Sequence, residues 1–150
     1  MSMLEVKDLQ VYYGVIQALK GISFEVEQGD VVALIGANGA GKTTLMKLLT
    51  GKEQPDSGEI IVGQTVKIGY YAQEVTHMDP NMRVIDYVRE VAEFVPTTEG
   101  SVSAAKMLER FLFEGSEQYT EIGRLSGGEK RRLNLLRVLM GAPNVLILDE

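Results

Sequence analysis

The segment with the clearest chemical potential is a glycine-rich loop, Gly36-Ala37-Asn38-Gly39-Ala40-Gly41-Lys42-Thr43. It fits the pattern G-x-x-x-x-G-K-[ST], in which glycines let successive backbone N–H groups point into one concavity. In such a loop the lysine reaches the β- and γ-phosphates of a nucleotide, and the next hydroxyl ligates Mg²⁺. The alternative is an ordinary turn before a helix. An apolar strand pattern before the loop and a helical pattern after it favour the phosphate cradle.

A carboxylate pair follows the last apolar run of the chain. Residues 145–148 are Val-Leu-Ile-Leu, and Asp149 and Glu150 come directly after them. At the end of a buried strand, Asp149 could hold Mg²⁺ through water and Glu150 could polarise an attacking water. Alone, this pattern is more often a strand that meets solvent. Together with the glycine-rich loop, it predicts phosphoryl-transfer chemistry.

A third segment combines a serine with two glycines at a predicted helix start. Ser126, Gly127, Gly128 and Glu129 precede the basic run at residues 130–132. The segment can be read as a second anion-binding helix terminus or as a capping box with flexible glycines, and the residues alone leave both interpretations open.

The predicted elements must position these residues. Alternation predicts half-buried antiparallel strands at residues 4–6 and 22–26, and the apolar run at 31–35 predicts a strand buried on both faces. Helical spacing of Leu45, Leu48 and Leu49 predicts a helix over 42–50 that stops at Gly51. Two short strands follow at residues 60–62 and 66–71, joined through residues 63–65.

The pattern becomes helical from about residue 79. Two helices are expected, with apolar faces made by Val84, Tyr87, Val88 and Val91 in the first and by Leu108, Phe111 and Leu112 in the second. Ser101 or Ser103 could cap the second helix. A longer helix over residues 125–140, capped by Ser126 and Glu129, leads to a final buried strand at 145–148.

Composition excludes several classes of protein. The 150 residues carry 15 Lys and Arg against 21 Asp and Glu, a net charge of −6, and 45% are hydrophobic, as in one soluble globular domain. The absence of cysteine excludes disulfides, thiolate metal sites and a cysteine nucleophile. The apolar runs are too short to span a bilayer and no secretory signal is visible, so we expect no membrane insertion and a cytoplasmic location. The basic residues 130–132 could bind nucleic acid, but the net charge favours a solvated face.

In their order, these motifs resemble the ATP-binding cassette (ABC) ATPases. Residues 125–129 look like the signature loop of that family, placed between a Walker A loop and a Walker B strand. Tyr13 resembles the A-loop aromatic that stacks on adenine, although Tyr12 could be that ring, and Gln73 resembles the Q-loop glutamine. Residues 1–50 look most like ATPase subunits of amino-acid importers, whereas residues 58–150 look more like the ribosome-associated ABC-F proteins. This mixture suggests an unusual branch or a hybrid, chimeric chain.

The resemblance implies an α/β fold, a P-loop NTPase of ABC type with a small antiparallel β region and a helical subdomain, and with the C-terminal core strands missing. It implies one partial domain over residues 1–150, made of a β and P-loop part (1–75), a helical subdomain (79–122), and the signature helix with the Walker B strand (123–150). It implies ATP and Mg²⁺ as cofactors. It assigns catalytic roles to Glu150, Gln73 and Lys42; nucleotide contacts to Tyr13, Gly36, Asn38, Gly39, Ala40, Gly41, Lys42, Thr43, Thr44, Ser126, Gly127 and Gly128; and Mg²⁺ ligation to Thr43, Gln73 and Asp149.

In the family, two cassettes pair head to tail, so Ser126 would act on a nucleotide held by the partner. The sequence ends at Glu150, before the D-loop and switch histidine of the family, and His77 is interpreted as an exposed loop residue. The resemblance also implies that the strand normally placed between the Walker A and Walker B strands is absent, and an open sheet edge favours association. We therefore expect a homodimer or swapped oligomer, or a rearranged sheet in which the strand at Val31 adjoins the strand at Val145. The resemblance offers a transporter membrane subunit or the ribosome as partner. Three hypotheses remain: an ATPase, a non-hydrolysing nucleotide-binding or dimerisation module, and a fragment that folds without nucleotide.

Overall fold

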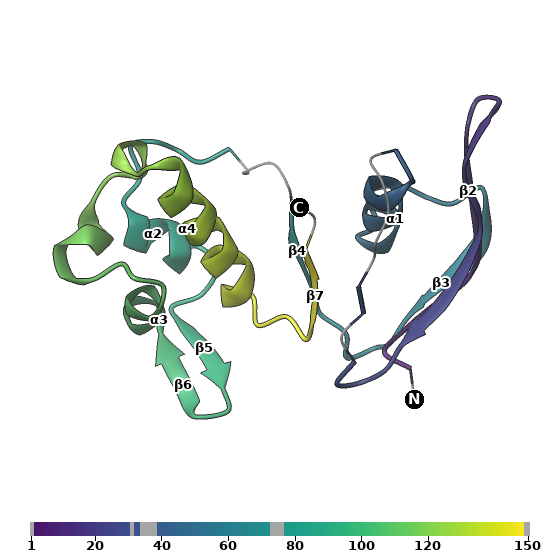
Figure 1. Cartoon of the computed structure of the whole chain (residues 1–150). Coiled ribbons are helices and arrows are strands. Elements are labelled where there is room, and N and C mark those ends of the chain that lie inside the picture. The colour runs from purple at the N-terminus through teal and green to yellow at the C-terminus, as the bar shows by residue number, and fades with distance from the viewer. Residues whose placement is uncertain (1, 31, 34–38, 73–76, 149–150) are drawn as a thin grey trace. The chain divides into compact units, whose positions relative to one another are not determined.

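The computed structural model describes residues 2–30, 32–33, 39–72 and 77–148 of the chain. It consists of two compact units, Met1–Val66 and Lys67–Glu150, shown with their helices and strands in Figure 1. Each unit has its own strands and its own buried apolar side chains.

The described residues of the first unit form a three-stranded antiparallel sheet and one helix. Strands β1 (Leu4–Tyr13), β2 (Ile16–Val26) and β3 (Ser57–Val62) lie in the order β2-β1-β3. Helix α1 (Lys42–Leu49) buries Leu45, Leu48 and Leu49, the face expected from the spacing of its leucines. Gly51 follows the helix with φ 76, a left-handed conformation typical of a helix C-terminus. The predicted antiparallel strands and the predicted helix are therefore confirmed.

Strand β1 changes its alternation at a bulge. Leu4 and Val6 are buried before the bulge, and Leu9 and Val11 are buried after it, so the buried positions shift from even to odd residue numbers. Register shifts lie between residues 6 and 9, and Asp8 there has φ 44. The bulge allows both ends of one long strand to bury their apolar side chains on the same face.

The second unit contains two further small sheets and several short helices. Strands β4 (Ile68–Tyr71) and β7 (Val145–Leu148) pair in parallel, and β5 (Phe94–Thr97) pairs with β6 (Gly100–Ser103) as an antiparallel hairpin. The helices are α2 (Val84–Arg89), α3 (Ala104–Arg110), α4 (Gly127–Met140) and the 3₁₀ turns η1 (Gly115–Tyr119) and η2 (Ile122–Arg124).

One apolar core holds this helical part together. It includes side chains from α2, α3, α4 and the β5–β6 hairpin, so the predicted helical segment shares its core with the helix that follows it. Its largest members include Phe113, Ile85, Leu108, Leu133 and Leu136, each 2% exposed or less.

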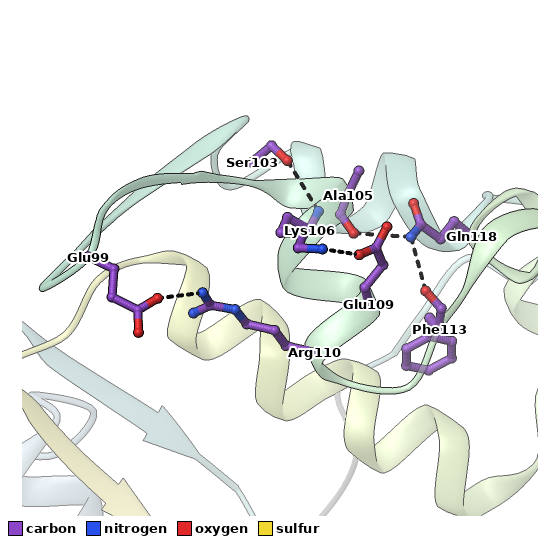
Figure 2. Close-up of polar contacts among 8 residues, drawn as sticks. All are labelled: Glu99, Ser103, Ala105, Lys106, Glu109, Arg110, Phe113 and Gln118. Carbon is purple, nitrogen blue, oxygen red and sulfur yellow. Dashed lines mark hydrogen bonds and ion pairs between the residues drawn. The ribbon is translucent and has the colours of Figure 1, made fainter.

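Polar contacts tie the hairpin and the 3₁₀ turn to α3, as Figure 2 shows. Glu99 in the hairpin turn pairs with Arg110 of α3 at 2.8 Å, and the Ser103 hydroxyl accepts the Lys106 N–H at the N-terminus of α3. Buried Gln118 donates its side-chain N–H groups to the carbonyls of Ala105 and Phe113, both at 3.0 Å. Of the two serines predicted as alternatives, Ser103 is therefore the cap.

The predicted helical faces need correction. Val91 is 40% exposed because α2 ends at Arg89, and Leu112 is 64% exposed with φ 65 because α3 ends at Arg110. The β5–β6 hairpin between the two helices was not predicted at all. Its strands are four residues each, too short for alternation to be told from a helical pattern.

Two predictions about buried strands also differ from the structure. In β7 only Ile147 is buried, while Leu146 and Leu148 are 41% and 53% exposed, because within the described residues β7 belongs to a sheet of two strands. Of the strand predicted at 31–35, residues 32 and 33 are described, and both are exposed outside any strand; the others lie outside the described residues. Within the described ranges β7 pairs only with β4, so the predicted pairing of the Val31 strand with the Val145 strand is not found there.

Candidate functional site

The N-terminus of α1 carries the described part of the glycine-rich loop, residues 39–43. Lys42 and Thr43 are the first two residues of the helix, and Gly41 is its N-cap, with φ 90 and no hydrogen bond from a capping side chain. A Cβ on Gly41 would lie 2.8 Å from Leu19 Cδ2 and 3.1 Å from the Ala18 carbonyl oxygen, and the left-handed φ also favours glycine at this position. The first N–H groups of a helix have no partner within it and carry partial positive charge, which suits a phosphate.

An aromatic side chain lies beside this helix. Tyr13, the last residue of β1, is 49% exposed, and its hydroxyl oxygen is 3.5 Å from the Thr44 hydroxyl oxygen in the first turn of α1. The same hydroxyl donates a hydrogen bond of 2.7 Å to the carboxylate of Glu53. Tyr12, the alternative residue for this role, donates its backbone N–H to the Asp56 carboxylate at 2.6 Å. The structure thus brings Tyr13 and Thr44 together, which the sequence separates by 31 residues.

Glu53 is the residue near this site that sequence reasoning missed. It lies 40 residues from Tyr13, in the segment after α1, and belongs to no motif. An acidic side chain in a connecting segment gives no signal in the sequence, so only the folded contact identifies it.

A complete capping box forms at the N-terminus of α4. The Ser126 hydroxyl accepts the Glu129 N–H at 3.2 Å, and the Glu129 carboxylate accepts the Ser126 N–H at 2.7 Å. Gly127 and Gly128 are the first two residues of the helix, so their N–H groups precede its first internal hydrogen bond, from the Lys130 N–H to the Ser126 carbonyl. The capping interpretation is therefore present in the structure, and the anion-binding role of Ser126, Gly127 and Gly128 stays a prediction.

Hydrogen bonds from Ser126 to the carboxylate lower the pKa of Glu129 below its ordinary value of 4.5. The backbone N–H of Ser126 is the main cause, and the Ser126 hydroxyl is the second. Both bonds favour the ionised carboxylate. The stabilisation from Glu129 is therefore fully present above its unfolded-state pKa and is lost as the pH falls through the lower folded-state pKa.

We expect Glu129→Gln to make the stability of the chain less sensitive to acid. The amide keeps the shape of the side chain but does not titrate, so the variant should be less stable than the parent at pH 7, with a difference that shrinks as the pH falls through the two pKa values. Urea unfolding across this acidic range measures it. Glu59→Gln, a matched change on an exposed position of β3, serves as control. A stability difference that stays constant with pH would contradict the prediction.

The basic side chains after the capping box do not share one environment. Arg131 is exposed, whereas the guanidinium of Arg132 lies over the Phe113 ring at 4.9 Å from its centroid. The predicted solvated face therefore includes a cation–π contact with the core.

Several candidate residues lie outside the described residues, namely Gly36, Asn38, Gln73, Asp149 and Glu150. The structure does describe strand β4, which precedes Gln73, and strand β7, which precedes Asp149 and Glu150. Tyr71 at the end of β4 pairs with Leu148 at the end of β7, so the carboxyl ends of these parallel strands lie side by side. His77, within the described residues, is exposed and outside regular structure, as predicted. Among the described side chains there is no group of three or more His, Asp or Glu that could hold a metal, and no described helix is long and apolar enough to cross a membrane.

Comparison with known proteins agrees with these features. A family model described as ABC transporter matches residues 19–150. The chain is 48% identical over 150 residues to the uncharacterized ABC transporter ATP-binding protein YfmR of Bacillus subtilis, and 38% identical over 149 residues to the energy-dependent translational throttle protein EttA of Escherichia coli K12. Both alignments cover 99% of this chain, but only 24% and 27% of those proteins. The chain thus spans about a quarter of the length of the curated relatives it matches.

The fold is also shared with solved structures. An ATP-binding subunit of an ABC transporter superposes with a TM-score of 0.77 at 25% identity, over 99% of this chain and 66% of that one. The ABC-type α/β fold implied by the motifs is therefore confirmed for a partial domain. The loop before α1, the capped helix α4 and a family match over most of the sequence lead to one conclusion: this chain belongs to the ABC transporter family, within its ATP-binding domains.

Proposed function

We propose that this chain binds Mg·ATP at the N-terminus of α1 and hydrolyses it when two cassettes pair. The observation that carries the proposal is the start of α1, where Lys42 and Thr43 follow an N-cap that has no capping side chain. Helix N–H groups left open in this way, next to a lysine and a hydroxyl, suit a triphosphate. Tyr13, beside Thr44, offers an aromatic face for the base.

The residues take the following roles in this proposal. Lys42 and the N–H groups at the start of α1 hold the terminal phosphates, and Thr43, Gln73 and Asp149 would hold Mg²⁺. Of these three residues the structure describes Thr43, and its hydroxyl fits Mg²⁺ because this cation prefers oxygen ligands. When bound, Mg²⁺ offsets negative charge on the phosphates. Glu150 orients the attacking water, and the adjoining ends of β4 and β7 support bringing the segments of Gln73 and Asp149 together.

The second nucleotide contact is proposed to come from another cassette. Ser126, Gly127 and Gly128 open α4 in a unit separate from α1, and their N–H groups suit the phosphates of a nucleotide held by a partner copy. This arrangement makes dimerisation dependent on ATP. The partner served by such a dimer, a transporter membrane subunit or the ribosome, stays a prediction. The name of EttA, a translational throttle protein, supports the ribosome as partner. The name of YfmR, an ABC transporter ATP-binding protein, supports a transporter membrane subunit.

Two measurements on the 150-residue chain test the proposal. Calorimetric titration should show Mg·ATP binding, with a matching rise in melting temperature because a ligand that binds only the folded state stabilises it. Steady-state phosphate release that Glu150→Gln abolishes would support hydrolysis. Binding without phosphate release would identify a non-hydrolysing module. A cooperative thermal transition that Mg·ATP does not move would identify a chain that folds without nucleotide.

A further inference from the structure

The carboxylate of Glu53 connects the exposed ring of Tyr13 to helix α1. One carboxylate oxygen, Oε2, accepts the Tyr13 hydroxyl at 2.7 Å, and the other, Oε1, is 3.6 Å from the ammonium nitrogen of Lys47 in the last turn of α1. The backbone N–H of Glu53 also donates to the Lys47 carbonyl at 3.3 Å. Glu53 is therefore held at one end of α1 while it holds the ring of Tyr13.

The position of Glu53 is not explained by the stability of α1. A negative charge near a helix C-terminus is unfavourable, because the last carbonyl groups already carry partial negative charge. Lys47 offsets this effect, and the pair is about one-third to one-half exposed, which makes a small contribution to stability. The hydrogen bond from Tyr13, in contrast, is short and made to an ionised acceptor, the stronger class of hydrogen bond.

Tyr13 needs such a restraint if its ring is to act as a platform. It lies at the end of β1, beside the turn at Gly14, and about half of its surface is exposed. Nearby Val15 is 99% exposed and gives the ring no cover. An exposed aromatic side chain loses rotamer freedom when a base stacks on it, and this loss weakens binding. A bond that holds the ring before the ligand arrives removes part of that loss.

We propose that Glu53 is a positioning residue for nucleotide binding, which holds the ring of Tyr13 beside the phosphate-binding helix through the tyrosine hydroxyl. The inference rests on the proposed function, since it assumes that a base stacks on Tyr13. It adds that recognition of the base depends on a carboxylate outside every sequence motif. Because Glu53 acts through the ring, its removal should weaken contacts to the base and leave contacts to the phosphates unchanged.

The test compares two ligands that differ in the base. Mg·ATP and Mg·tripolyphosphate are titrated by calorimetry into the parent chain, Tyr13→Phe, Glu53→Ala, Glu53→Gln and the double variant Tyr13→Phe/Glu53→Ala. We expect each of Tyr13→Phe and Glu53→Ala to lower the affinity for Mg·ATP about three- to tenfold, and the double variant to lose no more than either one. Glu53→Gln keeps an oxygen acceptor and should retain most of the affinity. Affinity for Mg·tripolyphosphate should stay unchanged throughout.

Tyr12→Phe is the matched control, since it removes a hydroxyl from the neighbouring exposed tyrosine, and it should leave both affinities unchanged. Tyr13→Phe retains the Glu53–Lys47 pair, so it tests the hydroxyl without disturbing the end of α1. Equal Mg·ATP affinities in the parent and Glu53→Ala would overturn the inference alone. So would equal losses for both ligands, or additive losses in the double variant. A parent chain that binds neither ligand would overturn the proposed function and this inference with it.

Discussion

Replacing Lys42 with alanine is expected to lower the affinity for Mg·ATP by about 10- to 100-fold, because a hydrogen bond to a charged group contributes about 1.5–3 kcal/mol. Lys42 is the first residue of α1, next to the N–H groups that the N-cap leaves without a capping side chain. Its ammonium adds a full positive charge where the helix supplies only partial charges. Calorimetric titration of Mg·ATP into the parent and the variant measures the loss.

The control for Lys42→Ala is Lys20→Ala, which removes the same charge from an exposed position of β2 and should leave the affinity unchanged. The two variants carry the same net charge, so a difference between them reports the position of the lysine. If both bind Mg·ATP as tightly as the parent, the start of α1 is not the phosphate site. If both lose affinity equally, overall charge is the cause.

Replacing Gly58 with alanine is expected to lower the free energy of unfolding by about 2–5 kcal/mol, more than the same change at any other described glycine of the first unit. Gly58 lies in β3 with φ 92, and a Cβ there would lie 2.3 Å from the Asp8 carbonyl oxygen and 2.7 Å from that of Lys7. These atoms are backbone at the bulge of β1, so they cannot move aside as a side chain can. Urea unfolding gives the change in free energy of unfolding.

Gly29→Ala separates the cost of the left-handed backbone conformation from the cost of the steric clash with β1. Gly29 has φ 91, nearly the same left-handed conformation, but a Cβ there would meet nothing within 4 Å among the described residues beyond its chain neighbours. Its substitution should therefore cost only the backbone strain, about 1–2 kcal/mol. Equal losses for the two variants would show that the β1 bulge moves away from β3 and that the close approach at Gly58 is not a constraint.

Some elements could be predicted because their signals are local. The spacing of Leu45, Leu48 and Leu49 predicts the buried face of α1, and residues three apart form the capping box of α4. A helix is built from contacts between residues three and four apart, so the sequence carries these contacts directly. The glycine-rich loop is recognisable for the same reason, since its glycines, lysine and threonine are close neighbours along the chain.

Other features depend on contacts between distant residues. The exposure of Leu146 and Leu148 depends on how many strands surround β7, and an apolar run cannot specify that number. The hairpin β5–β6 is similarly invisible because its four-residue strands are stabilised by packing into a core shared with α4. The apolar pattern also predicts that residues 32 and 33 lie in a buried strand, but both are exposed and outside any strand.

The sequence by itself therefore determined the ABC-type motif order, the helices α1 and α4 with their termini, and the residues that are candidates for phosphate and Mg²⁺ contacts. Only the tertiary structure decided that Tyr13 lies beside Thr44, that Glu53 holds its hydroxyl, and that the backbone of β1 approaches Gly58 too closely for any side chain. The physical reason is separation along the chain. Local hydrogen bonds and helical periodicity depend on residues that are neighbours in the sequence. Contacts across 31, 40 and about 50 residues form only when α1 and β3 have come together with β1.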